Sequence, residues 1–306
     1  MPTLYYQVLP LEANLRAYPK LVARTILTQL KQGQLVEGLL ALPKQPVGWV
    51  RVRAEMQGIS VEGYVKAFLL AKAASPTAPD LLVVFPLLPE AHLRTTVAVR
   101  ITNPDLRAYS LTDPGQPRRV ATDAAERVAE LAAIIAYLRV DGTARYKRTP
   151  SATFCNIYAH DYCHLAGAYL PRVWWRAKAL AQLVQGQKPI VRYGTTVEEY
   201  NANSLYNWLE DFGSDFGWRR TISLTEMQHA ANQGEVAIIC AQRINLNASG
   251  HIAAVVPEKG LHHAVWQGPR VTRPLQSQAG ATNFRYGGST WWTGRQFRRF
   301  GFWIHA

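Results

Sequence analysis

Short apolar runs separated by turn residues predict a small all-β unit at the start of the chain. Five runs lie within residues 4–70: LYYQVL, RTILTQL, QLVEGLLAL, GWVRVRA and VEGYVKAFLL. Strands of this length with turn signals between them are typical of a small barrel. The segment AKAASPTAPD follows and is rich in small residues and proline, which is typical of a linker. We therefore expect a boundary near Ser75.

The second half of the chain has helical periodicity first and strand-like patterns later. Apolar residues recur every three or four positions over residues 122–140, where Thr122 is placed to cap a helix and Asp141-Gly142 to end it. Further helices are expected at about 154–165, 173–183, 200–211 and 224–232. After Gly234 the pattern changes to the strands VAIICAQ and HIAAVVP and an aromatic C-terminus, FRRFGFWIHA. Helices followed by an antiparallel sheet predict an α+β fold.

These patterns divide the chain into three parts. Residues 1–72 form the predicted barrel, and residues 119–306 form the α+β domain. Residues 73–118 are a linker and an unassigned β-rich segment, because the runs LLVVF and TTVAVRIT lie among several prolines. They are interpreted either as a second small β module or as strands leading into the domain that follows.

Composition limits the partners. Of the 306 residues, 48% are hydrophobic and 18% are charged, which is enough apolar material for a packed core. The formal net charge of +13 favours a polyanionic partner such as nucleic acid, an anionic membrane or a cell wall. The basic residues are scattered and no nucleic-acid signature occurs, so we expect no nucleic acid. No apolar stretch is long enough for a membrane span. The N-terminus lacks the pattern of a secretory signal, so an extracytoplasmic target would require delivery by other means.

The segment around Cys155 carries the sharpest chemical signal. The chain has three cysteines, an odd number that leaves at least one free thiol. A helix expected directly after Ser151 or Thr153, either of which can cap it, places Cys155 in the first turn, where amides and the helix dipole stabilise a thiolate. The same amides can hold the oxyanion that forms when a thiolate attacks a carbonyl.

A nucleophilic cysteine needs a base on another element of the fold. His251 supplies one, since it opens a predicted strand after a glycine turn in SGHIAAVV. A third group would hold the imidazole in its useful tautomer. The candidates for that group are Gln278, Glu258 and Asn283.

Other interpretations of these residues remain open. Cys155 can be a buried structural thiol like Cys163 and Cys240, which lie in apolar stretches. A zinc site is the other alternative, built from His160, Cys163 and His164 with help from His262 and His263. We favour the nucleophile, and its chemistry requires neither a metal nor an organic cofactor.

Four short motifs of the N-terminal unit resemble the bacterial Src-homology-3-like domain. They are, in order, Asn14-Leu15-Arg16 with Pro19, Leu30-Lys31-Gln32-Gly33, Gly48-Trp49-Val50-Arg51-Val52, and Gly63-Tyr64-Val65. Such domains commonly bind cell-wall peptides or accompany wall hydrolases. The resemblance implies that Trp49 and Tyr64 contact substrate, whereas the alternative interpretation is that both rings are core.

The C-terminal half resembles the NlpC-like and CHAP-type branch of papain-like cysteine peptidases. The resemblance covers residues 149–283 and rests on TFCN at the start of a helix, then GEVAII, then GHIAAVV. It implies a papain-like fold, Cys155 as nucleophile with His251 as base, and cleavage of amide bonds in peptidoglycan. The match does not define the third catalytic residue; we expect Gln278 in that role and Asn156 in contact with substrate. About 95 residues separate the cysteine from the histidine, with an added helical stretch around residues 197–216.

The expected function is therefore that of a peptidoglycan endopeptidase or amidase. We expect it to act on the cell wall either as a phage-type lysin or as an antibacterial effector, the latter with a secretion apparatus and an immunity protein as partners. Two alternatives from other classes are a cysteine acyltransferase or deamidase that acts on proteins, and a wall-binding protein without catalysis.

Overall fold

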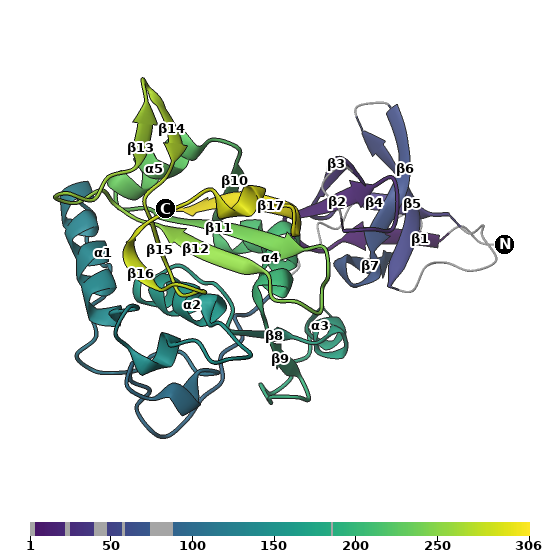
Figure 1. The fold of residues 1–306 in the computed structure, drawn as a ribbon. Helices are drawn as coiled ribbons and strands as arrows, with labels where there is room; N and C mark the ends of the chain where they lie inside the picture. The colour runs from purple at the N-terminus through teal and green to yellow at the C-terminus, as the bar shows by residue number, and fades with distance from the viewer. Residues whose placement is uncertain (1–3, 22–24, 40–47, 57–58, 74–87, 185) are drawn as a thin grey trace. The chain divides into compact units, whose positions relative to one another are not determined.

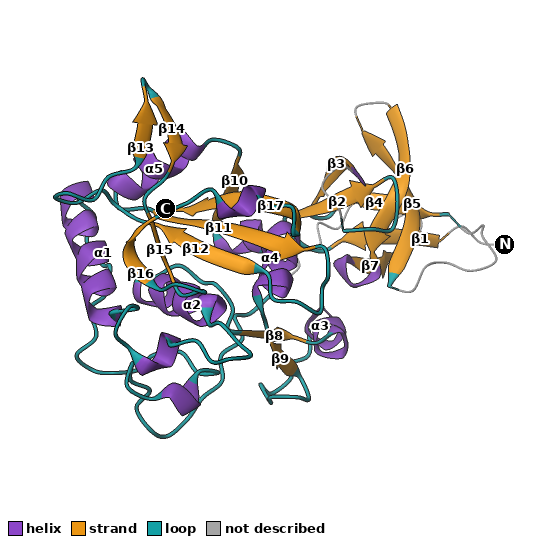
Figure 2. Ribbon diagram, viewed as in Figure 1, coloured by secondary structure: helices purple, strands orange, loops and turns teal. Residues whose placement is uncertain are grey.

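The computed structural model describes the chain except for residues 1–3, 22–24, 40–47, 57–58, 74–87 and 185 (Figures 1 and 2). It divides into two compact units. The first comprises Met1–Pro89, Trp175–Ile190 and Glu210–Asp215, and the second comprises Glu90–Trp174, Val191–Leu209 and Phe216–Ala306. The expected boundary near Ser75 and the run LLVVF lie outside the described residues, and the predicted limits 1–72, 73–118 and 119–306 stay predictions.

The first unit contains a seven-stranded antiparallel sheet in the order β3-β2-β6-β5-β4-β1-β7. Along β5, Val52 and Ala54 are buried, while Arg51 and Arg53 point outward and pair with Glu62. This alternation is that of a strand with one face in the core. The strands are β1 (Leu4–Val8), β2 (Glu12–Arg16), β3 (Ile26–Lys31), β4 (Leu35–Gly38), β5 (Trp49–Met56), β6 (Ile59–Lys66) and β7 (Leu70–Ala73).

Strands therefore form in all five predicted runs, and two more were not predicted: β2, and β7, which begins at the last residue of the fifth run. The likeness to a Src-homology-3-like domain stays a prediction. Two later segments complete this unit: Phe212 stacks on Phe68 with ring centroids 5.7 Å apart, and the Asp215 carboxylate accepts a hydrogen bond from the Leu11 amide at 2.9 Å.

The second unit is built on a six-stranded antiparallel sheet in the order β10-β17-β11-β12-β15-β16. Its strands are β10 (Trp218–Thr221), β11 (Val236–Arg243), β12 (His251–Val255), β15 (Gln276–Gln278), β16 (Phe284–Gly287) and β17 (Phe297–His305). Two small two-stranded sheets accompany it: β8 (Val173–Trp175) with β9 (Val197–Glu199), and β13 (Val265–Gln267) with β14 (Arg270–Arg273).

Helices cover both faces of this sheet. Seven of the eight residues of β11 are buried, because Ile239 packs on α5 (Leu224–Asn232) while Cys240 faces α4 (Ala202–Asp211) through a hydrogen bond from its sulfur to the Ala202 carbonyl. The helix α2 (Cys155–Leu165) lies against β12 and β15. Antiparallel sheets with helices agree with the predicted α+β class, and the papain-like identity stays a prediction.

Helix ends coincide with the expected ones or differ from them by up to four residues. The 224–232 helix is confirmed, whereas α1 (Ala124–Leu138) is capped by Asp123 and not by Thr122. Neither Ser151 nor Thr153 caps α2. Its N-cap is Phe154, which makes no side-chain bond, because Thr153 lies one residue too early.

Two further predictions were wrong. The helix expected at 173–183 begins later, as α3 (Ala177–Val184), because Val173–Trp175 is the extended strand β8. The run TTVAVRIT, all of it described, contains no strand. Its Val99 exchanges hydrogen bonds with Thr112 instead, receiving one from the Thr112 amide and donating one to the Thr112 hydroxyl. In the part of the chain that the structure describes, no helix is both long and apolar enough to cross a membrane.

Candidate active site

Cys155 is the first residue of α2, and its side chain is almost fully buried, with 3% of its surface exposed. The sulfur accepts backbone hydrogen bonds from Ile252, from Asn156 and from Cys155 itself. These amides favour the thiolate, but burial outweighs them and raises the thiol pKa. The resting form is therefore the neutral thiol, and ionisation requires a base.

His251 is the first residue of β12 and directly precedes the residue whose amide reaches the Cys155 sulfur. Its Nε2 lies 2.7 Å from Oε1 of Gln278. The Gln278 amide nitrogen donates to the Thr282 carbonyl at 3.2 Å, which orients the carboxamide with its oxygen toward the imidazole. Nε2 therefore carries the proton and Nδ1 keeps its lone pair.

Packing fixes the plane of this imidazole. Trp291 meets the His251 ring edge to face, with centroids 4.3 Å apart, and the indole N–H of Trp291 donates to Gln276 at 2.8 Å. On another side, a Cβ on Gly280 would come within 3.2 Å of the His251 Cε1 atom. Burial also lowers the pKa of His251, so the ring is neutral and able to accept a proton.

The three candidates for the orienting group differ in their hydrogen-bond partners. Gln278 contacts His251, as described. The Glu258 carboxylate instead binds the side chains of Asn232 and Trp266 and the Ala264 amide.

Asn283 is also engaged elsewhere. Its oxygen accepts from the Gly280 amide, and its nitrogen donates to the carbonyls of Val140 and Tyr146, each at 2.9 Å. Asn283 therefore holds together the loop that carries Gly280, and its amide makes these contacts instead of one to His251.

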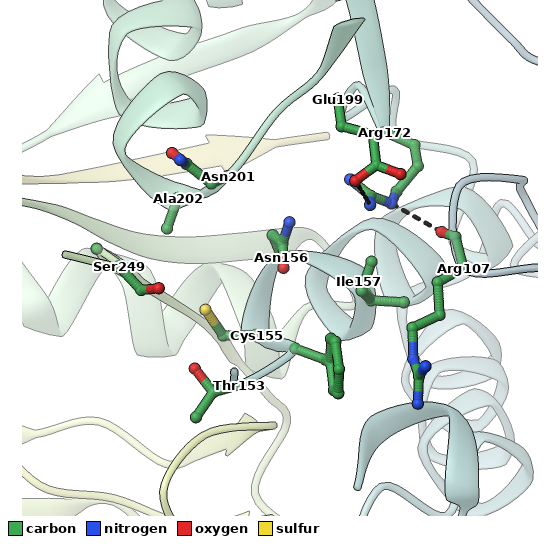
Figure 3. A pocket seen from close by; sticks show the side chains of 12 residues that line it. Arg107, Thr153, Cys155, Asn156, Ile157, Arg172, Glu199, Asn201, Ala202 and Ser249 are labelled. Atoms are coloured by element: carbon green, nitrogen blue, oxygen red, sulfur yellow. Dashed lines mark hydrogen bonds and ion pairs between the residues drawn. The ribbon is translucent and has the colours of Figure 1, made fainter. Parts of the chain in front are cut away.

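A cavity of about 200 Å³ opens beside the cysteine (Figure 3). Thr153 and Ser249 flank the thiol in this view. Asn156, which we expected to contact substrate, lines the cavity and donates to the Tyr200 carbonyl at 2.9 Å. The lining residues are Arg107, Thr153, Phe154, Cys155, Asn156, Ile157, Arg172, Glu199, Asn201, Ala202, Ser249 and Gly250.

Two arginines give the far wall of this cavity a positive charge. Arg172 is 4% exposed and pairs with Glu199 at 2.9 Å, while Arg107 lies over the ring of Phe154 at 4.0 Å. Arg172 also donates to the Arg107 carbonyl at 2.8 Å. Sequence reasoning missed both arginines, because the segments that carry them are distant in the chain and show no local motif.

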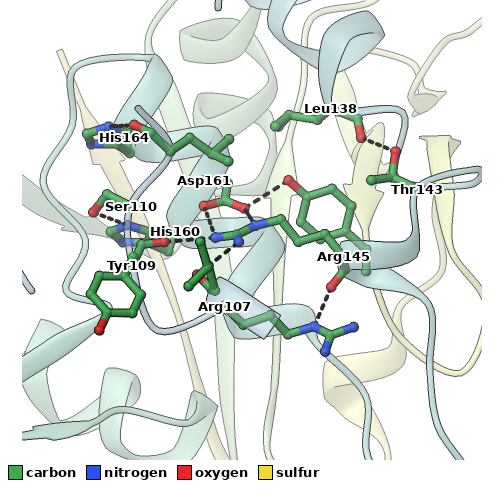
Figure 4. A network of polar contacts seen from close by, with 12 residues as sticks. Arg107, Tyr109, Ser110, Leu138, Thr143, Arg145, His160, Asp161 and His164 are labelled. Atoms are coloured by element: carbon green, nitrogen blue, oxygen red, sulfur yellow. Dashed lines mark hydrogen bonds and ion pairs between the residues drawn. The ribbon is translucent and has the colours of Figure 1, made fainter. Parts of the chain in front are cut away.

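A buried ion pair between Arg145 and Asp161 anchors α2 (Figure 4). The Arg145 guanidinium contacts the Asp161 carboxylate at 2.6 and 3.1 Å, and both side chains are fully buried. Tyr146 donates to the same carboxylate at 2.8 Å, and Arg145 also donates to the carbonyls of Leu106 and Tyr109. Because Asp161 is on the same helix as Cys155, this network anchors the helix that carries the thiol.

The helix residues named for the zinc alternative are engaged in other contacts. His160 is held by the Leu170 carbonyl and the Ser110 hydroxyl, His164 by the Leu111 carbonyl, and Cys163 is fully buried. Over the described ranges, no group of three or more histidine, cysteine or acidic residues is placed to hold a metal ion. None of the three cysteines forms a disulfide in the described structure, and all three are buried.

The two aromatic residues expected to contact substrate belong to the first unit. Trp49 is 7% exposed, and Lys66 places its ammonium over the indole at 4.5 Å. Tyr64 is partly buried and faces Arg51 across the β5–β6 pair. Their contact with substrate stays a prediction, although Trp49 offers little free surface.

No protein-family model matches the sequence, and no curated protein matches it. A solved structure described as "Structure of NlpC2 from Trichomonas vaginalis" has 12% sequence identity and a TM-score of 0.20, covering 98% of this chain and 73% of that one. A TM-score this low does not establish a common fold. The chemistry must therefore be argued from the side chains.

Proposed function

We propose that the chain is a cysteine hydrolase that cleaves amide bonds in the peptide part of bacterial peptidoglycan. The main support is the hydrogen bond between His251 and Gln278, because it leaves Nδ1 of the imidazole as an acceptor. The adjacent amide, that of Ile252, already reaches the Cys155 sulfur. A thiol, a neutral imidazole and an orienting amide are the parts that a cysteine hydrolase requires.

The mechanism begins with the neutral pair. Nδ1 of His251 takes the proton of Cys155 as the sulfur attacks the amide carbonyl, and the carbonyl oxygen becomes an oxyanion. Amides of the first turn of α2 are directed at the sulfur, and they stabilise negative charge there. The C–N bond breaks as the imidazolium gives its proton to the leaving amine. Water, deprotonated by the same imidazole, then hydrolyses the thioester and frees the enzyme.

Peptidoglycan is proposed as substrate on two grounds. The resemblance of the Cys155 and His251 segments to NlpC-like and CHAP-type peptidases points to wall peptides. The net charge of +13 favours accumulation near anionic wall polymers. The proposal includes action on the cell wall after lysis or after injection, in the second case with an immunity protein in the producing cell. No metal or organic cofactor takes part in these steps.

Digestion of purified sacculi tests this function. Wild type should release soluble fragments with new amino groups, and the fragment masses identify the bond cleaved. Cys155→Ala should release nothing. Cys163→Ala makes the same chemical change further along α2, away from the reacting atoms, and should retain hydrolysis.

Other outcomes would reject the proposal. If sacculi stay intact with wild type while protein substrates lose ammonia or gain acyl groups in a Cys155-dependent reaction, the enzyme is a deamidase or acyltransferase. If wild type binds sacculi and neither reaction occurs, the chain is a binding protein without catalysis.

A further inference from the structure

The turn and hairpin that follow β12 carry an unusual set of side chains. Residues 259–273 contain Lys259, Arg270 and Arg273 and two histidines, with no aspartate or glutamate among them. All three cations are exposed. We call these residues the basic hairpin segment; in Figure 1 its strands β13 and β14 stand out from the sheet, with α5 at their base.

The basic hairpin segment is fixed to the second unit by specific contacts. The amide of Val271 donates to the Thr225 hydroxyl on α5 at 2.9 Å, and the ring of Trp266 meets His229 of the same helix with centroids 5.4 Å apart. The Trp266 indole N–H also donates to Glu258 at 3.1 Å. One side of the hairpin is thus attached to α5, and the segment presents its remaining side chains in a defined orientation.

Apolar side chains are exposed among these cations. Leu261 is 96% exposed, and Val265 and Trp266 are 39% and 36% exposed. Single exposed apolar residues are common on protein surfaces. Here an exposed leucine in the turn before β13 and a tryptophan share fifteen residues with three exposed cations, and this combination is typical of segments that lie in a membrane interface.

We propose that the basic hairpin segment binds the surface of an anionic lipid bilayer. The cations would meet lipid phosphates, Leu261 would enter the acyl boundary, and Trp266 would lie at the headgroup level, where indole rings concentrate. The positive charge of the segment favours an anionic partner. The exposed Leu261 favours lipid over a soluble polyanion, because a phosphate polymer offers a leucine side chain no apolar environment. This surface is separate from Cys155 and independent of the proposed hydrolysis.

Co-sedimentation with lipid vesicles tests the surface. The full chain should bind vesicles that contain phosphatidylglycerol and not vesicles of phosphatidylcholine alone, and added salt should weaken the binding. The double variant Arg270→Gln/Arg273→Gln should lose about 25-fold in affinity, at about fivefold for each cation. Leu261→Ser should lose about tenfold.

Matched controls come from exposed residues elsewhere in the same unit. Val120 is 79% exposed, so Val120→Ser controls for Leu261→Ser, and Arg94→Gln/Arg148→Gln removes two other exposed cations. Both controls should bind like wild type, and circular dichroism should show all variants folded.

Three results would overturn the proposal. The first is no binding to the phosphatidylglycerol vesicles. The second is equal loss in the control variants, which would mean that net charge alone acts. The third is unchanged binding by Leu261→Ser combined with tight binding to dextran sulfate, which would identify a soluble polyanion as the ligand.

Discussion

Replacing Gln278 tests whether this amide orients the catalytic base. In Gln278→Leu the side chain keeps its approximate size but loses the oxygen that accepts from His251 Nε2 at 2.7 Å. The imidazole can then adopt the tautomer with its proton on Nδ1, which cannot take the proton of Cys155. We expect a lower kcat/KM on a wall-peptide substrate, with the fold unchanged.

The size of the effect follows from the cost of a buried donor that loses its partner. That cost is about 1 to 3 kcal/mol, and since about 1.4 kcal/mol corresponds to tenfold, kcat/KM should fall by roughly 5- to 150-fold. The pH profile gives a second readout. The Gln278 bond raises the pKa of His251, so its loss should move the acid limb of kcat/KM to lower pH, whereas Gln278→Glu should move it to higher pH.

Glu258 provides the matched control, because it was the alternative orienting residue and its carboxylate is occupied by Asn232, Ala264 and Trp266. Glu258→Gln should retain wild-type kcat/KM. The reasoning is refuted if Gln278→Leu is fully active, or if Glu258→Gln loses the same factor while remaining folded.

Three further predictions concern pH and stability. Burial lowers the pKa of His251 below its ordinary 6.5, so the base stays unprotonated in mild acid and kcat/KM measured across a buffer series should begin to fall only below that pH. Arg145→Met leaves the Asp161 carboxylate buried without its ion pair and should cost about 3 to 5 kcal/mol in the free energy of unfolding, measured by chemical denaturation. Burial raises the pKa of Asp215 from 3.8 to about 6, so its stabilising contribution is complete below 3.8 and is lost as pH rises through 6. Asp215→Asn should therefore raise the free energy of unfolding at neutral pH by roughly 1 to 2 kcal/mol and leave it unchanged in acid. Equal effects of that substitution at both pH values would contradict the assignment.

Local patterns predicted most elements of the fold. The helix at 224–232 has the expected bounds, and Ser223 caps it by accepting from the Glu226 amide, a contact between neighbouring residues. The strands β11 and β12 were found because their apolar runs are short and rich in β-branched residues. Val173–Trp175 was misassigned because an apolar run next to a helix is compatible with either structure.

The candidate site was only partly predictable, for a physical reason. Cys155 and His251 were identified by their places at the start of a helix and of a strand, which are local features. The contact made by Gln278 depends on the loop that brings the Thr282 carbonyl to its amide, and Trp291 reaches His251 from a turn forty residues away in the sequence. Such contacts depend on tertiary packing, so the sequence left three orienting candidates open.

The division of the chain into units has a consequence for how this protein can be shortened or recombined. The unit that contains residues 1–89 also uses Trp175–Ile190 and Glu210–Asp215, and Phe212 has its stacking partner, Phe68, in the N-terminal part. A fragment that starts after residue 89 would carry both segments without the strands they pack on, exposing apolar surface. The N-terminal unit is therefore no detachable module, and exchanging it between proteins would require five junctions in the chain to be matched instead of one.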